Sequence, residues 1–217
     1  MTDPITQPVR ESYDRLAAEY ARRLFNELDG KPLDRELLTR FALQVAGRGP
    51  VCDMGCGPGH VARFLHQAGA TAFGLDLSPA MIDEARRLNP GIAFDVGNML
   101  ALGLPSESLA GIAAFYAIVN IPQSSLPVVF AEMARVLEPG GLLLLAFHMG
   151  NEALQVEELW GQPVAMTFYL IEPSGIRRQL EAAGFHIEET IEREPYAPDV
   201  EHPTRRAYIF ARKQGPD

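Results

Sequence analysis

Cysteine is scarce in this chain, with only Cys52 and Cys56 among 217 residues. Two thiols in this context do not suggest the disulfide framework of a small secreted protein. No second pair of metal-binding side chains lies near them in the sequence, so we predict no metal site. We expect Cys52 to be a small buried residue of a strand and Cys56 to lie in a loop.

Long apolar runs are also missing. None approaches the roughly 20 residues that a membrane span needs, and residues 1–10 contain no apolar core of a signal peptide. We therefore expect a cytoplasmic protein with no membrane partner. With 217 residues, of which 47% are hydrophobic and 22% charged, the chain is long enough for one α/β domain with a well-buried core.

Basic residues are fewer than acidic ones: the chain has 19 basic and 28 acidic residues, which gives a formal net charge of −9. They come as scattered pairs, such as Arg22–Arg23 and Arg86–Arg87, rather than as a basic stripe interleaved with aromatics. An acidic chain is repelled by phosphate backbones, so we expect no nucleic-acid partner. The sequence gives no indication of the oligomeric state.

Glycine, in contrast, is concentrated in one informative place. A short apolar run at 51–54, which contains an acid, precedes Gly55, Gly57 and Gly59, and an amphipathic segment follows. This order predicts a strand, a tight turn and a helix, in which glycines let the backbone bend sharply and approach a ligand. A dinucleotide-binding G-x-G-x-x-G pattern would need glycine at position 60, where this chain has His60.

Strands and helices alternate beyond this turn. The expected strands are 51–54, 71–75, 92–96, 111–116, 142–147, 185–191 and 205–212, with a further β-like run at 164–171. The expected helices are 9–28, 32–47, 60–69, 79–88, 126–137 and 173–183. Alternation of this kind predicts a doubly wound sheet with right-handed crossovers. Ligands of such sheets bind beyond the carboxyl ends of the strands.

Polar side chains stand at two of those predicted strand ends. Asp76 comes 21 positions after Gly55, where an acid can accept hydrogen bonds from ribose hydroxyls. Asn98 offers a donor and an acceptor to an adenine edge, and Met99 could pack on the purine. The alternative for Asp76 is a turn or cap acid beside the helix start at Ser78–Pro79. The alternative for Asn98 and Met99 is a polar loop in which the methionine fills a gap.

Taken together, these motifs resemble the class I S-adenosylmethionine-dependent methyltransferase family in its small-molecule branch. The resemblance runs from about residue 10 to 213 and rests on the glycine turn, Asp76, the loop at 97–99, the segment 135–141 and a lid-like helix at 13–20. It implies a Rossmann-like, mostly parallel seven-stranded sheet with an antiparallel last strand and an N-terminal helical lid. It also implies methyl transfer from S-adenosylmethionine, giving S-adenosylhomocysteine, to a small-molecule acceptor.

The resemblance carries a set of cofactor-binding residues onto this chain by position. The three glycines would border the methionine part of the cofactor, Asp76 would hold the ribose, and Asn98 and Met99 would meet the adenine. The family often has an acid where Asn98 stands. Asp53 would order the glycine turn and the cofactor amino group. The predicted set is Tyr13, Tyr20, Asp53, Gly55, Cys56, Gly57, Gly59, Asp76, Leu77, Met81, Gly97, Asn98, Met99 and Tyr116.

Methyl transfer is an in-line displacement, which the protein assists mainly by positioning and desolvating the reactants. Aromatic faces can stabilise the sulfonium cation, and Tyr13, Tyr20 and Tyr116 are candidates for this role. The alternative is that these tyrosines only pack in the hydrophobic core. A general base is needed only if the acceptor must lose a proton early. His148, at the end of the strand 142–147, is the best-placed candidate, and a structural histidine is the alternative.

We expect one domain that covers residues 1–217. Its expected parts are a helical lid at 1–48, a cofactor-binding core at 49–150, and an acceptor cover with C-terminal strands at 151–217. Trp160 and residues 166–170 would cover the acceptor pocket. Two other functions stay open: a non-catalytic cofactor-binding or interaction protein on the same fold, and a nicotinamide-dependent oxidoreductase, which His60 disfavours. The acceptor and the methylated atom type do not follow from the sequence.

Overall fold

The computed structural model describes residues 6–215, and strands and helices alternate through much of this part of the chain. The strands are β1 (Pro50–Met54), β2 (Thr71–Asp76), β3 (Ala93–Val96), β4 (Leu109–Phe115), β5 (Leu137–His148), β6 (Ala153–Leu159), β7 (Gln162–Tyr169), β8 (Phe185–Arg193) and β9 (Arg206–Lys213). The helices are α1 (Gln7–Leu24), α2 (Pro32–Val45), α3 (His60–Gln67), α4 (Pro79–Leu88), α5 (Leu126–Val136) and α6 (Pro173–Ala182), with 3₁₀ turns η1 (Glu27–Gly30) and η2 (Gln123–Ser125).

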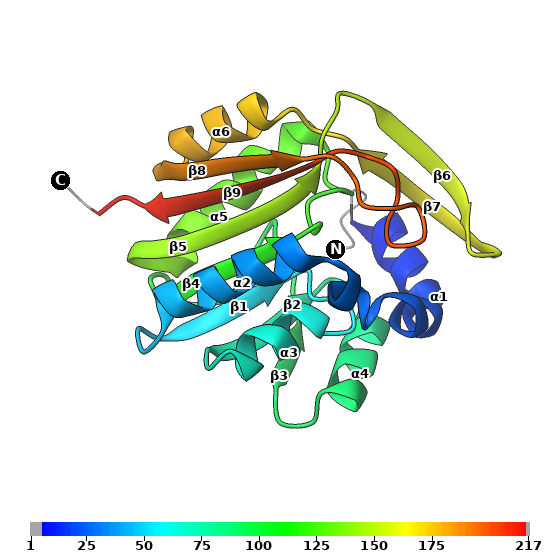
Figure 1. The fold of residues 1–217 in the computed structure, drawn as a ribbon, viewed down its shortest axis with the longest axis horizontal. Coiled ribbons are helices and arrows are strands. Elements are labelled where there is room, and N and C mark those ends of the chain that lie inside the picture. Colours follow the sequence, from blue (N-terminus) through cyan, green and yellow to red (C-terminus); the bar gives the residue numbers. More distant parts are fainter. Residues whose placement is uncertain (1–5, 216–217) are drawn as a thin grey trace.

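A seven-stranded sheet of order β3-β2-β1-β4-β5-β9-β8 runs through the middle of the molecule (Figure 1). Neighbouring strands from β3 to β5 are parallel, and β9 runs antiparallel to both β5 and β8. This confirms the predicted Rossmann-like, mostly parallel sheet with its last strand antiparallel. The strand order reverses between β1 and β4, and ligands of open α/β sheets bind at such a switch point.

The central strands are buried on both faces because helices cover both sides of the sheet. In β5, Leu143 and Leu145 face the layer that contains α5 and α6, whereas Leu142 and Leu144 face α2 and α3. Each fully buried leucine contributes roughly 1.5–3 kcal/mol relative to an exposed one. The near-continuous apolar run of this strand is therefore what a doubly covered parallel strand requires.

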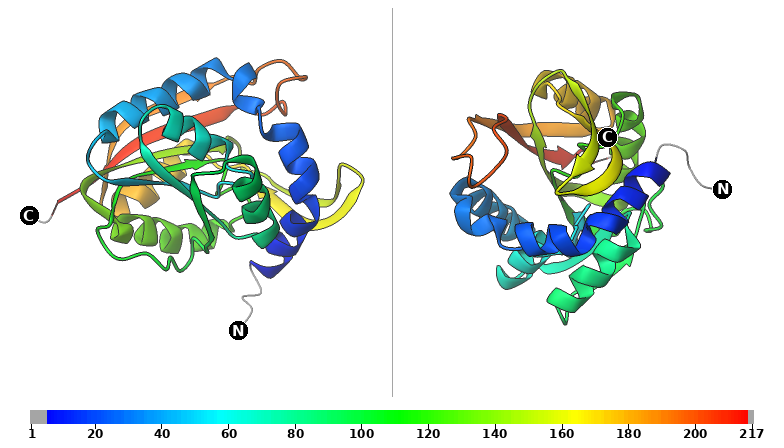
Figure 2. Two further views of the ribbon diagram at one scale, coloured as in Figure 1. Left: turned by 90° about the horizontal axis from the view of Figure 1, so that it is seen from below. Right: turned by 90° about the vertical axis from the view of Figure 1, so that its right-hand side faces the viewer.

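The carboxyl ends of the parallel strands meet at the edge of the sheet where α1 and the β6–β7 hairpin lie (Figure 1). Figure 2 shows from two further sides that α1 and this hairpin share one end of the molecule. Helix α2 lies on a sheet face through Leu38 and Phe41. The predicted lid of residues 1–48 is thus divided, since only its first helix crosses this end of the sheet.

Three of the observed helices and strands differ from the expected elements by more than two residues. Helix α1 ends at Leu24 and is followed by the separate turn η1, rather than continuing to residue 28. Strand β5 begins at Leu137, because this residue pairs with Leu109 ahead of the expected turn at 138–141. Strand β6 was not expected, and it pairs with β7 in a separate two-stranded sheet. Within residues 6–215, no helix is long and apolar enough to span a bilayer.

Candidate functional site

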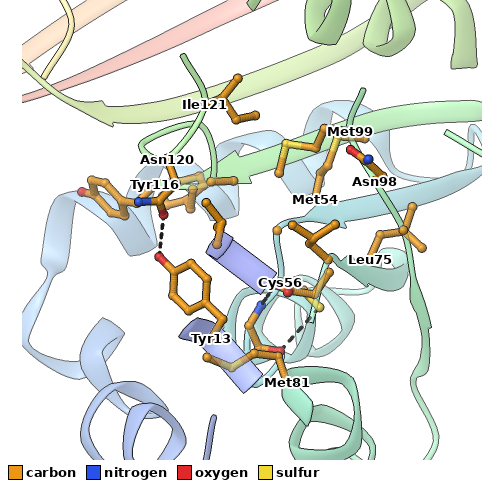
Figure 3. A pocket seen from close by; sticks show the side chains of 18 of the residues that line it. Tyr13, Met54, Cys56, Leu75, Met81, Asn98, Met99, Tyr116, Asn120 and Ile121 are labelled. Atoms are coloured by element: carbon orange, nitrogen blue, oxygen red, sulfur yellow. Dashed lines mark hydrogen bonds between the residues drawn. The ribbon is translucent and has the colours of Figure 1, made fainter. Parts of the chain in front are cut away.

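A cavity with about 1040 Å³ of empty space, its open mouth included, lies at the switch point of the sheet. Its wall brings together the glycine turn, the ends of β2 and β4, the loop after β3, and α1 (Figure 3). The lining residues from the predicted set are Tyr13, Tyr20, Gly55, Cys56, Gly57, Asp76, Leu77, Met81, Gly97, Asn98, Met99 and Tyr116. Asp53 and Gly59 are the two that lie outside this wall.

The glycine turn is shaped by close packing under the cavity. Gly55 has φ +75°, and a Cβ there would lie 2.5 Å from the Cβ of Ala117 and 3.0 Å from Cε of Met99. Gly59 has φ +81°, and a Cβ there would lie 2.6 Å from the ring of Phe94. Gly59 therefore faces the protein interior, where it lets α3 begin close to β3, rather than bordering the ligand space.

A buried hydrogen bond of Asp53 connects β1 to α3. Its Oδ2 accepts a hydrogen bond of 2.8 Å from the backbone N–H of Ala62. Burial, which outweighs the lowering effect of His60, raises the pKa of Asp53 to about 7. The bond supports the predicted ordering of the glycine turn, whereas contact with a cofactor amino group remains a prediction.

Asp76 links the glycine turn to the start of α4. Its Oδ2 accepts from the N–H of Gly57 and its Oδ1 from the N–H of Ser78, both at 2.9 Å. The side chain of Ser78 caps α4 by accepting from the N–H of Met81 at 3.1 Å. Asp76 thus orders the turn rather than capping the helix, and burial raises its pKa. Each carboxylate oxygen keeps lone-pair capacity toward the cavity.

The loop after β3 presents Asn98 and Met99 to the same cavity. Oδ1 of Asn98 accepts a hydrogen bond of 2.9 Å from the N–H of Leu100. The carbonyl half of the amide is therefore engaged within the loop, and the NH₂ group is the half left to meet a ligand. Figure 3 shows Met99 close to Met54 on the cavity side opposite Tyr13.

Helix α1 is fastened over the cavity by polar contacts. The hydroxyl of Tyr13 donates to Oδ1 of Asn120 at 2.7 Å (Figure 3). Asp14 accepts from the hydroxyl of Ser78 at 2.6 Å, at the start of α4. Burial raises the pKa of Tyr13 and of Tyr20 above the ordinary tyrosine value, so both hydroxyls are neutral at physiological pH.

The β6–β7 hairpin packs against α1 beside the cavity-lining tyrosines. Val164 and Met166 form a small buried cluster with Leu16. Trp160, at the hairpin turn, lies with its ring centroid 5.8 Å from that of Tyr20. Trp160 is not part of the cavity wall and instead supports Tyr20, which is. A direct role of Trp160 in covering an acceptor remains a prediction.

Two ionisable residues of the cavity wall, Glu27 and His60, were not predicted from the sequence to face the ligand space. Nε2 of His60 lies 2.9 Å from Oε1 of Glu27, and Nζ of Lys31 lies 2.6 Å from Oε2 of the same carboxylate. Burial by itself would raise the pKa of Glu27. The hydrogen bonds and charges of His60 and Lys31 have the larger combined effect and lower this pKa to about 2. No local pattern links positions 27 and 60, so only the fold reveals the pair. Asn120 had a weaker signal, as the one polar residue in the segment 118–121.

Tyr116 connects the cavity to a buried polar cluster. It has an unusual φ of +54°, and strained backbone of this kind is often found at functional sites. Its hydroxyl donates to Oδ1 of Asp34 at 3.1 Å. Nζ of Lys31 and the guanidinium of Arg206 lie 5.2 and 5.6 Å from the centre of its ring.

His148, the predicted candidate base, lies beside the cavity wall rather than in it. Its ring centroid is 5.1 Å from that of Tyr116, and its Nδ1 is 2.7 Å from the hydroxyl of Thr204. Burial, followed by the charge of Arg206, lowers the pKa of His148 to about 3. Because an efficient base has a pKa near the working pH, this value argues against the predicted role as a base.

Comparison with known proteins identifies a family model and several relatives. Residues 51–141 match the model described as a methyltransferase domain. A malonyl-[acyl-carrier protein] O-methyltransferase from Pectobacterium atrosepticum is 31% identical over 156 residues, which cover 71% of this chain and 58% of the relative. A trans-aconitate 2-methyltransferase from Methylobacterium nodulans is 38% identical over 111 residues, covering 50% and 41%. The chain therefore spans about half the length of these curated relatives.

Solved structures share the fold at lower identity. An S-adenosylmethionine-dependent methyltransferase from Methanosarcina mazei has a TM-score of 0.68 at 17% identity, covering 76% of this chain and 92% of that one. The [4+2]-cyclase SpnF has a TM-score of 0.69 at 18% identity, covering 94% and 97%. Because these names differ in chemistry, the likeness establishes the fold and not the reaction.

Proposed function

We propose that this protein transfers a methyl group from S-adenosylmethionine to an oxygen of a small carboxylic acid, because residues 51–141 match the model of a methyltransferase domain. The observation that carries the proposal is the cavity, in which a glycine turn, an acid and an amide converge from consecutive strand ends.

The residues present fit the cofactor. The open lone pairs of Asp76 suit the paired hydroxyls of a ribose, and the amide NH₂ of Asn98 with the thioether of Met99 suits an adenine edge and face. Gly57 leaves room beside Tyr20, because a Cβ at this glycine would meet only that ring, at 3.6 Å. The methionine part of the cofactor would lie in this space.

The chain contributes position and desolvation to the reaction. S-adenosylmethionine supplies, when bound, a methyl group activated on a positively charged sulfur. Tyr13 and Tyr20 would exclude water from the reacting atoms. Their neutral rings, with that of Tyr116, would also place electron-rich faces near the cation. Alignment of acceptor and methyl group by such walls accounts for much of the acceleration that a displacement of this kind needs.

The acceptor class is supported by the relatives and by the ionisation of carboxylates at neutral pH. Malonyl groups and trans-aconitate, which appear in the relatives' names, both carry carboxylates. Beside the cavity wall, Lys31 and Arg206 flank Tyr116, and each is also paired with a carboxylate, Glu27 or Glu201. A carboxylate is already ionised at neutral pH, so its methylation needs no general base. That agrees with a site whose candidate base has a low pKa.

The first test is calorimetric titration with S-adenosylmethionine and S-adenosylhomocysteine. We expect dissociation constants of about 1–100 μM, weakened at least about tenfold in Asp76→Asn, which loses the charge but keeps an acceptor oxygen. Asp95→Asn is the matched control, because that side chain is 73% exposed and outside the cavity wall. A folded wild-type protein that binds neither compound would contradict the cofactor assignment.

The second test is turnover with defined acids. Release of S-adenosylhomocysteine is followed with trans-aconitate and with a malonyl thioester, and the product is identified by mass. Ester formation with either supports the proposal. Cofactor binding without any transfer to oxygen acids would favour the non-methylating alternative, for which the cyclase with the same fold is a precedent. NADH binding in place of S-adenosylmethionine binding would favour the oxidoreductase.

A further inference from the structure

The end of β5 carries a histidine whose hydrogen bonding is determined by its neighbours. Nδ1 of His148 lies 2.7 Å from the hydroxyl of Thr204, and a guanidinium N–H of Arg206 donates to the same hydroxyl. Arginine is always a donor, so the hydroxyl oxygen is the acceptor in that bond. The hydroxyl proton of Thr204 must then go elsewhere.

Nδ1 of His148 is the one acceptor that this hydroxyl meets among the residues described. If Nδ1 carried a proton instead, the hydroxyl would accept twice and its own proton would have no partner in residues 6–215. The arrangement in which all these protein groups have partners is therefore the one in which the Thr204 hydroxyl donates to Nδ1 of His148. It places the imidazole proton on Nε2, because the hydrogen bond at one ring nitrogen sets the state of the other.

Nε2 of His148 forms no hydrogen bond with any part of the chain that the structure describes, yet it is not occluded as Nδ1 of His60 is. The ring lies next to Tyr116, which belongs to the cavity wall. A free N–H donor thus stands beside the switch point of the sheet. Burial and nearby positive charge, reflected in the pKa of about 3, keep this ring neutral at physiological pH.

We propose that His148 donates a hydrogen bond through Nε2–H to a carboxylate oxygen of the acceptor, and that Thr204 and Arg206 are positioning residues that hold this tautomer. The proposal deepens the proposed function and rests on it for the identity of the bound molecule. Several charged or polar groups face the ring: Tyr116 from β4, Arg206 from β9, Glu201, His202 and Thr204 from the connection between β8 and β9, and Lys31 from the start of α2. Lys31 is paired with Glu27 at 2.6 Å and Arg206 with Glu201 at 3.6 Å, so an anionic acceptor would be recognised through the Nε2–H donor of His148 rather than through an excess of positive charge.

The tautomer can be tested without any acceptor. In protein labelled with ¹⁵N-histidine, two-bond ¹H–¹⁵N correlations distinguish the two tautomers and the cation among the five histidines. The resonance lost in His148→Gln identifies the residue. We expect a neutral Nε2–H ring at pH 7, retained in Thr204→Ser and altered in Thr204→Val, which has a similar shape and no hydroxyl. An Nδ1–H ring or an imidazolium in the wild type would overturn the proposal.

The second readout is the binding of carboxylates to the protein loaded with S-adenosylhomocysteine. Malonate, glutarate and citrate are titrated while the His148 signal is followed, with malonamide as the neutral control. We expect the carboxylates to shift this signal and to bind about tenfold to hundredfold more weakly to His148→Phe, with S-adenosylhomocysteine affinity unchanged. If S-adenosylhomocysteine binds normally and no carboxylate moves the signal, the acceptor role of His148 is overturned while the cofactor assignment stands. If S-adenosylhomocysteine itself does not bind, the proposed function fails first.

Discussion

The hydroxyl of Tyr13 donates a hydrogen bond of 2.7 Å to Oδ1 of Asn120 and so joins the first helix to the loop that follows β4. The amide NH₂ of Asn120 donates in turn to the carbonyl of Thr167 in β7 at 2.9 Å. Three segments that are far apart in the sequence therefore meet at one asparagine on the cavity wall. This junction therefore holds α1 and β7 in place beside the cavity.

Tyr13→Phe should weaken S-adenosylhomocysteine binding by about threefold to tenfold, because the net value of one hydrogen bond is roughly 0.5–1.5 kcal/mol. The loss should appear mainly as faster dissociation, since the cover would open more readily. Stopped-flow displacement measures this rate. Tyr196→Phe is the control, because its hydroxyl accepts from the N–H of Leu33 away from the cavity. Equal dissociation rates in wild type and Tyr13→Phe would refute the prediction.

Gly55→Ala should abolish cofactor binding and destabilise the fold by more than about 2 kcal/mol. A left-handed conformation costs a non-glycine residue roughly 1–2 kcal/mol, and the new Cβ would also collide with Ala117 at 2.5 Å. Gly69→Ala is matched in conformation, with φ +92°, but has open space around it. It should lose only the conformational part. Urea unfolding of both variants checks the difference, which should vanish if packing at Gly55 is unimportant.

Asp53→Asn should change how stability depends on pH. The folded-state pKa of about 7 exceeds the ordinary value near 4, so the folded protein binds this proton more tightly than the unfolded chain does. Wild-type stability is therefore lost as the pH rises from about 4 to 7. Asparagine cannot ionise, and it can still accept from Ala62. The stability of Asp53→Asn relative to wild type should increase across this interval by a few kcal/mol, to order of magnitude, in urea unfolding curves. Parallel pH profiles would argue against it.

Glu201→Gln should destabilise the protein by about 3–5 kcal/mol, because removing one member of a buried ion pair leaves its partners uncompensated. The side chain is 2% exposed and accepts from Arg193, with Arg206 at 3.6 Å. The matched control is Glu192→Gln, whose side chain is 42% exposed and pairs with Arg205 at 3.1 Å. It should cost at most about 1 kcal/mol. Thermal unfolding compares the two, and similar losses would show that burial of the pair is not decisive.

Much of the cofactor half of the molecule was predictable, because its evidence is local. The glycines at 55, 57 and 59, the acid at the end of β2 and the Ser78–Pro79 helix start all act over a few residues. Period and turn chemistry therefore place β1, α3, β2 and α4 close to their observed bounds. The predicted contact of Gly59 with the cofactor was wrong, because glycine is needed there to leave space for the ring of Phe94 in β3.

The remainder depends on contacts between distant positions. Glu27 meets His60, and His148 meets Thr204, only after the sheet has brought their elements together. Strand β6 is largely exposed and lacks a regular apolar face, so no period marks it. Its hairpin is held instead by packing of β7 against Leu16 of α1. Patterns within a single segment cannot report such partnerships.

The antiparallel strand β9 lies inside the sheet, between β5 and β8, although it comes late in the chain. A growing polypeptide that has emerged only as far as residue 200 would already contain the whole glycine turn, but β5 would be an open edge. Arg206, at the beginning of β9, and Thr204, just before this strand, would still be missing from the proposed acceptor site. During synthesis, the proposed cofactor site and the proposed acceptor site would thus form at different times, and insertion of β9 would complete the second.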